Sequence, residues 1–163
     1  MQPSVIASII ALRVAELLVP VGFRRRSRLF SRPRNDLVHL IQIQSSQANS
    51  QQASSCTVNL GIWVPMLEPD SAPNIAGAHW RERLGSVCPE RQDKWWRADD
   101  AASAELRANE IFASLRDYGL PALEELPDVA SVLRLWSTGT CPGLTGVQAV
   151  RYAGKLRGAV LQP

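Results

Sequence analysis

The sequence contains few of the residues that build covalent or metal-bound centres. Its three cysteines, Cys56, Cys88 and Cys141, are odd in number and far apart, so they form neither a CxxC pair nor a zinc-knuckle spacing. The two histidines, His39 and His79, stand outside any HExxH or comparable ligand spacing. We therefore expect reduced thiols, no bound metal and no cofactor.

An uninterrupted apolar run of membrane-spanning length is also missing. Residues 4–19 are apolar, but Arg13 and Glu16 lie within them and no basic cluster precedes them. These features argue against a signal peptide and against a membrane span. We expect a cytoplasmic protein without a membrane partner.

The motifs of common catalytic and nucleotide-binding sites are absent. The sequence contains no GxSxG, no P-loop and no GxGxxG, and the glycines within 139–146 lack the Lys-Ser/Thr that follows a phosphate-binding loop. The paired carboxylates Asp99-Asp100 and Glu124-Glu125 are adjacent, so on a helix they point in different directions. We therefore assign no catalytic residues, and an enzyme is the less favoured class of protein.

The sequence does contain enough apolar residues for one stable core. It has 163 residues, of which 45% are hydrophobic, and a chain of this length needs no disulfide or metal to be stable. Its net charge of +3 is uneven, because residues 1–34 hold seven arginines against one glutamate, whereas residues 35–136 are acidic. All but two of the basic residues are arginine, which suits bidentate contacts to carboxylates and phosphates.

Hydrophobic periodicity predicts one α+β domain over residues 1–163. A helix is expected over 5–18, with Ser4 as its N-cap, followed by a β-hairpin of residues 23–32 and 37–44. The polar tract 45–55 is predicted to be a mobile loop, and residues 56–64 alternate as a strand.

The second half of the chain is predicted to be mainly helical. After an irregular crossing over 65–78, a helix is expected over 101–118, ended by Gly119 and Pro121. A broken helix pair over 121–136 and a last helix over 146–160 complete the chain. The expected fold is an N-terminal helix, an antiparallel sheet of three or more strands, and C-terminal helices packed on one face.

Five short segments occur in an order that suggests a family. They are Leu18–Arg26, Val58–Ile62, Arg81–Gly85, Asp93–Trp96 and Tyr118–Pro121. In this order they resemble the bacterial domain-of-unknown-function family 4304 (DUF4304) over residues 15–136. The resemblance implies an α+β fold, and because the family has no established reaction it carries over no catalytic residues. The tract 45–55 then resembles an insertion and residues 137–163 an extension.

One face of the predicted sheet carries amides and an aromatic ring. Thr57, Asn59 and Trp63 alternate on one strand and are expected to meet Gln42 and Gln44 on its neighbour. With Trp95 and Trp96 nearby they would form a binding cleft. The alternative is that the amides satisfy loop backbone groups and the tryptophans belong to the core.

An arginine-rich segment is the strongest electrostatic feature. On a single strand Arg24, Arg26, Arg28 and Arg32 would share one face and could bind phosphates or an acidic protein surface. Nucleic acid is the less favoured partner, because no aromatic residues alternate with the arginines to stack bases.

These observations favour a non-enzymatic binding protein whose partner is another protein, in a sharper version an immunity-type protein that neutralises a toxin. A hydrolase or transferase using His79, Glu82 and Arg83 is one alternative. Nucleic-acid binding through the Arg24–Arg34 hairpin is the other.

Overall fold

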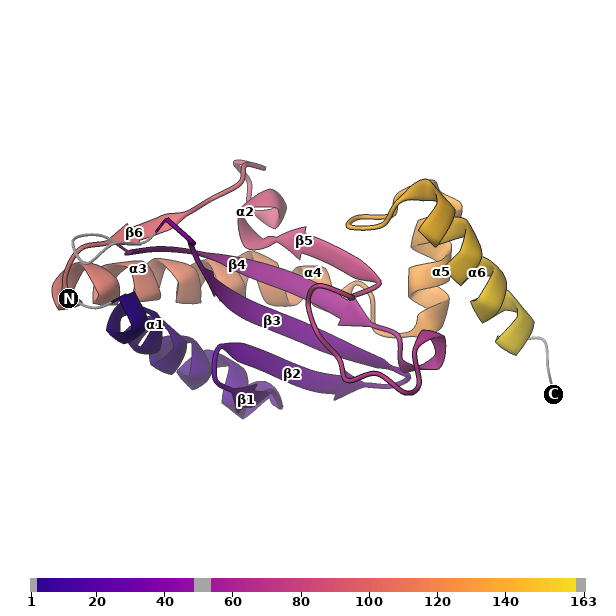
Figure 1. The fold of residues 1–163 in the computed structure, drawn as a ribbon, viewed down its shortest axis with the longest axis horizontal. Helices are drawn as coiled ribbons and strands as arrows, with labels where there is room; N and C mark the ends of the chain where they lie inside the picture. Colours follow the sequence, from indigo (N-terminus) through magenta and orange to yellow (C-terminus); the bar gives the residue numbers. More distant parts are fainter. Residues whose placement is uncertain (1–2, 49–53, 161–163) are drawn as a thin grey trace.

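The computed structural model describes residues 3–48 and 54–160 and has an α+β fold (Figure 1). The strands are β1 (Arg24–Arg26), β2 (Leu29–Arg34), β3 (Leu37–Ser45), β4 (Ser54–Trp63), β5 (Trp80–Arg83) and β6 (Trp96–Ala98). The helices are α1 (Pro3–Leu18), α2 (Leu84–Val87), α3 (Ala101–Ser114), α4 (Leu120–Glu124), α5 (Val129–Ser137) and α6 (Gly146–Val160). The N-terminal helix, the antiparallel sheet and the C-terminal helices confirm the predicted fold class.

The sheet has two different faces. Its strands are antiparallel in the order β1-β2-β3-β4-β5, and β6 also pairs with β4. The face that we call the inner face carries Phe30, Ile41 and Leu60, which are paired in register and buried under the helices. The face that we call the open face carries Leu29, Gln42, Asn59 and Arg83 at the next register position. Alternation along strand 56–64 therefore runs as predicted.

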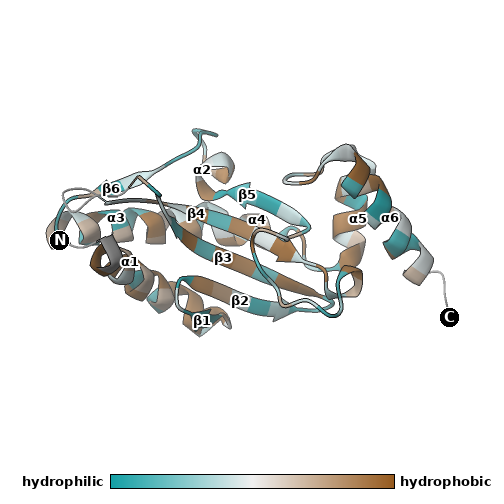
Figure 2. Ribbon diagram, viewed as in Figure 1, coloured by the Kyte–Doolittle hydropathy of each residue, from teal (hydrophilic) through white to brown (hydrophobic). Residues whose placement is uncertain are grey.

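Apolar residues concentrate between the sheet and the helices (Figure 2). Ile10 and Val14 of α1 pack with Ala108 and Ile111 of α3 beneath the inner face. The main core also takes in Leu156 of α6, so the last helix packs against the same hydrophobic cluster.

The N-terminal helix α1 already includes Pro3, so Ser4 lies within the helix and the prediction that it is the N-cap was wrong. A 3₁₀ turn at Val19–Val21 follows, and Gly22 adopts φ 96° to lead into β1. Only glycine takes this left-handed conformation without strain.

The prediction of a single strand over residues 23–32 was wrong. The chain reverses at Ser27, which has φ 57°, and pairs Arg26 with Leu29, so the segment forms the hairpin β1–β2. As a result Arg24 and Arg26 lie on the open face, whereas Arg32 lies opposite His39 on the inner face. The expected stripe of four arginines does not form.

The predicted end of a helix at Gly119 was also wrong. Residues Leu115–Gly119 form a π-helix that leads directly into α4. A Cβ on Gly119 would lie 3.0 Å from Leu84 Cδ1, so this glycine permits close packing instead of ending the helix. Pro121 then follows as the second residue of α4 and does not end the helix.

The remaining chain follows the prediction more closely. The expected break at Pro127 separates α4 from α5, and Asp128 caps α5 by accepting a hydrogen bond from Ser131 N–H. Helices α5 and α6 lie beyond one end of the sheet (Figure 1). The polar tract is shorter than expected, because β3 extends to Ser45 and β4 begins at Ser54; residues 49–53, and the mobility predicted for them, lie outside the described part of the chain.

Candidate functional site

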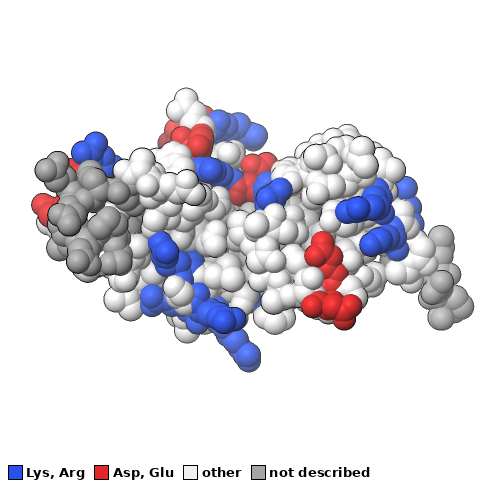
Figure 3. Space-filling model, viewed as in Figure 1, with Lys and Arg blue, Asp and Glu red and all other residues white. Residues whose placement is uncertain are grey.

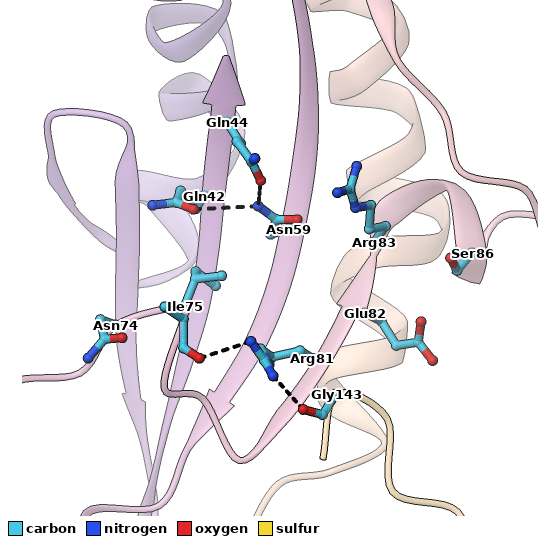
Figure 4. Close-up of a pocket in the computed structure, with 11 residues that line it drawn as sticks. Gln42, Gln44, Asn59, Asn74, Ile75, Arg81, Glu82, Arg83, Ser86 and Gly143 are labelled. Atoms are coloured by element: carbon cyan, nitrogen blue, oxygen red, sulfur yellow. Dashed lines mark hydrogen bonds between the residues drawn. The ribbon is translucent and has the colours of Figure 1, made fainter. Parts of the chain in front are cut away.

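The open face of the sheet is hollowed between β3, β4 and β5 (Figure 4). The hollow has a volume of about 640 Å³. Its polar lining comes mainly from Gln42, Gln44, Asn59, Arg81 and Arg83. The rest of the lining comes from residues 74–76, which precede β5, and from Gly143, which precedes α6.

Three amides form the floor of this hollow. The sequence predicted that these side chains would meet on one face of the sheet. Asn59 lies directly opposite Gln42 in the β3–β4 register. Its Nδ2 donates hydrogen bonds to Gln44 Oε1 at 2.7 Å and to Gln42 Oε1 at 3.4 Å. The bonds align the three side chains, so their remaining donors and acceptors point in fixed directions.

Trp95 lies beside the hollow and holds Arg83. The Arg83 guanidinium lies 5.1 Å from the centroid of the Trp95 ring and donates to Asp93 Oδ1 at 3.1 Å. Trp95 Nε1 donates to Asp93 Oδ2 at 3.2 Å. The cation is therefore both stacked and neutralised within the chain.

The other two tryptophans do not line the hollow. Trp63 is on the open face, but it is 1% exposed because Ile75 and Ala78 cover it. Trp96 pairs with Cys56, which places it in the core beneath the inner face at 2% exposure. The expected cleft therefore keeps its amides and, at its margin, Trp95 alone of the three rings.

Gly61 explains why the covering segment can approach the sheet so closely. A Cβ at this position would lie 2.9 Å from Ile75 Cδ1 and 3.2 Å from Ala78 Cβ. Thr57, which was expected in the cleft, is buried and donates its Oγ1 hydrogen to Lys94 O at 2.9 Å.

Arg81 is a residue of this site that the sequence reasoning missed. Its guanidinium donates to Ala76 O at 2.9 Å and to Gly143 O. Its backbone N–H donates to Pro142 O at 3.0 Å. The available signal was its position two residues before Arg83, which places both side chains on the same face of a strand.

A second, smaller pocket of about 340 Å³ adjoins the hollow on the side of the β1–β2 hairpin. Arg26, Arg28, Gln42, Gln44 and Ser45 contribute polar groups to its lining. Arg28 donates a hydrogen bond to Ser45 Oγ. Basic side chains gather over this hairpin in Figure 3.

The arginines of β1 are not neutralised within the described part of the chain. In residues 3–48 and 54–160, no carboxylate oxygen lies within 4.0 Å of the guanidinium of Arg24 or Arg26. Arg32, by contrast, pairs with Glu124 on the inner side. Arg24 and Arg26 therefore leave unneutralised positive charge on the open face.

The three residues of the alternative enzymatic site do not converge. His79 is fully buried and its Nδ1 accepts from Val64 N–H at 3.0 Å, and burial lowers its pKa. Glu82 and Arg83 are successive strand residues that point to opposite faces, as Figure 4 shows. Burial raises the pKa of Glu82, and neither His79 nor Arg83 is hydrogen-bonded to its carboxylate: His79 accepts from Val64 N–H and Arg83 donates to Asp93.

The other titratable side chains have structural partners or are buried. His39 Nε2 donates to Leu126 O at 3.0 Å while its Nδ1 accepts from Arg32, and burial lowers its pKa. Cys56 is buried, which raises the pKa of its thiol to about 12. Within the described ranges no three His, Cys, Asp or Glu side chains gather as a metal site would require. The helices in those ranges include none with the length and apolar character needed to cross a bilayer.

A family model described as "Domain of unknown function (DUF4304)" matches residues 14–125. The chain belongs to this family. No curated protein and no solved structure matches it.

The DUF4304 match divides the site in two. All the strand residues of the hollow, from Gln42 to Arg83, lie within the matched region, whereas Gly143 lies beyond it. Helices α5 and α6 also lie beyond the match. This part of the DUF4304 protein therefore adds a wall to a hollow that the family region builds.

Proposed function

We propose that this DUF4304 protein is a non-enzymatic binding module whose open sheet face binds an acidic surface of a partner protein. The observation that carries the proposal is the composition of that face. The described strand residues that alternate onto this face include arginines and amides and no acidic residue; Glu82, at the next register position of β5, borders the hollow from the other face. Helices cover the inner face, whereas on this face the segment around Ile75 and Ala78 covers Leu40 and Trp63 and leaves the amides and Arg24 and Arg26 uncovered by helices.

The two kinds of side chain have different roles in this proposal. Arg24 and Arg26 supply positive charge that attracts and orients an acidic partner. The amide cluster of Gln42, Gln44 and Asn59 supplies directed hydrogen bonds at the centre of the face. Because the amides stand on paired strands, they are already ordered before a partner arrives, which lowers the entropic cost of binding.

In a more specific form, we propose that the partner is a toxin and that the protein acts in the cytoplasm as an immunity-type protein. A small domain with a strongly basic face suits the neutralisation of an acidic protein surface, and the proposal rests on that analogy. Co-expression with each toxin encoded beside it tests this form. Failure to protect cells from every one of them would contradict it.

The binding proposal is tested by capture of partners from a lysate of the native host, with mass spectrometry of what co-purifies. The wild-type protein is compared with Asn59→Ala and with the double variant Arg24→Glu/Arg26→Glu. We expect both variants to lose the same stoichiometric protein, because one removes the amide bonds and the other reverses the charge.

A matched control is Arg157→Glu, which reverses an exposed charge on α6, away from the open face. We expect this variant to retain the partner, and thermal melts establish that all variants are folded. Equal capture by every folded variant would contradict the proposal. Capture of nucleic acid alone, with an affinity that falls steeply with salt, would favour the alternative function.

A further inference from the structure

We propose that the pocket beside the β1–β2 hairpin binds a phosphate monoester. The pocket is the 340 Å³ space between Arg26, Arg28, Gln42, Gln44 and Ser45. We infer that a phosphorylated side chain of the partner protein carries this phosphate group, and this part of the inference rests on the proposed function. It is carried by the side-chain donors that line the pocket, which are the guanidinium groups of Arg26 and Arg28 and the NH₂ groups of Gln42 and Gln44.

The amides are oriented by Asn59. Because Asn59 Nδ2 donates to the Oε1 atoms of both Gln42 and Gln44, each glutamine has its oxygen occupied and its NH₂ group free to donate. In Figure 4 the nitrogen of Gln42 is directed away from Asn59. Both glutamines line the smaller pocket as well as the hollow, so they can present N–H donors to it.

The hairpin turn places two guanidinium groups around the same space. Ser27 takes φ 57°, and this tight reversal brings Arg26 and Arg28 to either side of the turn. Arg28 is held by its bond to Ser45 Oγ. Since that oxygen accepts from Arg28, the Ser45 hydroxyl hydrogen is available to a ligand.

Nothing in the described lining offsets this positive charge. The residues that complete it, Ser27, Leu29 and Ile43, carry no carboxylate. Arg26 also has no carboxylate within ion-pair distance in the described part of the chain. A phosphate monoester fits this donor set better than a carboxylate, because it offers three terminal oxygens and close to two negative charges.

The larger hollow is a poorer anion site, although it also contains two arginines. Arg81 already donates to Ala76 O and Gly143 O, Arg83 is paired with Asp93, and Glu82 also lines this hollow. Asn59 thus lies between two parts of the open face. In the larger hollow Arg81 and Arg83 have partners within the chain, whereas in the smaller pocket Arg26 has no carboxylate partner among the described residues.

The test is to titrate the full chain with inorganic phosphate, O-phosphoserine, serine and acetate in turn. Binding is monitored by two-dimensional NMR and by calorimetry. We expect saturable binding of phosphate and O-phosphoserine and none of serine or acetate. Tighter binding of O-phosphoserine than of phosphate indicates a phosphorylated side chain as the source, whereas the reverse order contradicts that source.

Two variants test the assignment of donors. Arg26→Gln is expected to weaken O-phosphoserine binding by about tenfold or more, since it removes a charge-assisted hydrogen bond. Asn59→Asp is expected to weaken it as well, although residue 59 does not line this pocket, because an added carboxylate draws the glutamine NH₂ groups towards itself. Arg157→Gln on α6 is the control and should leave binding unchanged.

Absence of saturable phosphate binding, or equal loss in Arg26→Gln and Arg157→Gln, would overturn the inference. Equal affinity for acetate would overturn it in favour of a carboxylate site, and much tighter binding of a single-stranded oligonucleotide would overturn it in favour of nucleic acid. The two proposals are tested by different measurements. If phosphate does not bind to the wild-type protein but the Arg24→Glu/Arg26→Glu variant loses the protein partner, the phosphate inference is wrong and the proposed function stands.

Discussion

Gly85 fixes the position of the segment that neutralises Arg83. A Cβ at this residue would lie 2.2 Å from the backbone oxygen of Gln92 and 2.9 Å from Lys94 N. Gly85 O also accepts a hydrogen bond from Gln92 N–H at 3.2 Å. The absence of a side chain therefore brings Asp93 to its place beside Arg83.

Gly85→Ala should lower the free energy of unfolding by about 2–3 kcal/mol, because backbone atoms must move to admit one methyl group. Chemical denaturation measures the change. Gly154→Ala on α6 is the matched control, since nothing lies within 4 Å of its added Cβ. This second alanine should raise stability by roughly 0.5–1 kcal/mol through helix propensity. Equal effects of the two substitutions would contradict the packing role of Gly85.

At the level of elements, His39 joins the sheet to the helices. It stands on β3, donates to Leu126 O after α4, and accepts from Arg32, which also pairs with Glu124 of α4. The ring is fully buried and neutral, with Nε2 as its donor, because burial lowers its pKa. The junction between sheet and helices therefore depends on one protonation state.

Acidification from pH 7 to pH 5 should lower the melting temperature. The unfolded chain binds a proton on His39 near pH 6.5, whereas the folded state resists that proton because its pKa is lowered. The unfolded state thus binds more protons in this window, and stability falls as pH falls. His79 acts in the same direction.

Thermal melts between pH 5 and 8 measure this effect in the wild-type protein and in His39→Gln. The variant should show a smaller slope, and comparison of the two cancels the opposite contribution of Glu82, whose pKa is raised by burial. Identical slopes would contradict the assignment to His39.

Local patterns were sufficient to predict some elements and not others. Alternation over 56–64 predicted both faces of β4, and with them the meeting of Gln42 and Asn59. The reversal at Ser27 was missed because Ser27-Arg28 lacks the Asn-Gly or Asp-Gly signal of a tight hairpin. The π-helix was missed because Gly119 and Pro121 together are the local signal of a helix end, whereas in the structure Gly119 is packed closely against Leu84, which lies far away in sequence.

The same distinction applies to the candidate site. Neighbouring strands bring the three amides together, so sequence alternation was enough to place them. The burial of Trp63 and Trp96 depends on tertiary contacts that the local sequence does not show. The segment around Ile75 packs over Trp63, and the pairing of β6 with β4 places Trp96 on the inner face. The closure of the hollow by Gly143 likewise joins segments distant in sequence.

At the level of the whole molecule, α6 packs on the family region although it lies outside the DUF4304 match. Leu156 is fully buried in the main core. Tyr152 donates to Glu68 Oε1 at 3.3 Å and meets the His79 ring edge-on at 5.0 Å. These contacts predict that α6 unfolds together with the sheet.

Leu156→Ala should therefore lower the free energy of unfolding by about 2–4 kcal/mol, as expected for truncation of a buried leucine. Val147→Ala, at a residue that is 81% exposed, should change it by less than about 0.5 kcal/mol. Denaturation curves measure both values, and hydrogen exchange reports on α6 itself. Exchange of α6 amides long before those of β4 would contradict joint unfolding.

The bond from Arg81 N–H to Pro142 O has a further consequence for self-association. An outer strand with free backbone groups is a template on which another chain can add a strand and begin a fibre. At the β5 edge of the sheet, Pro142 O accepts the hydrogen bond of the Arg81 backbone N–H, so this donor is not available to another strand. At the opposite edge, β1 consists of three arginines, whose mutual repulsion opposes the pairing of two copies. A chain that stopped where the family match stops would expose the β5 border to aggregation.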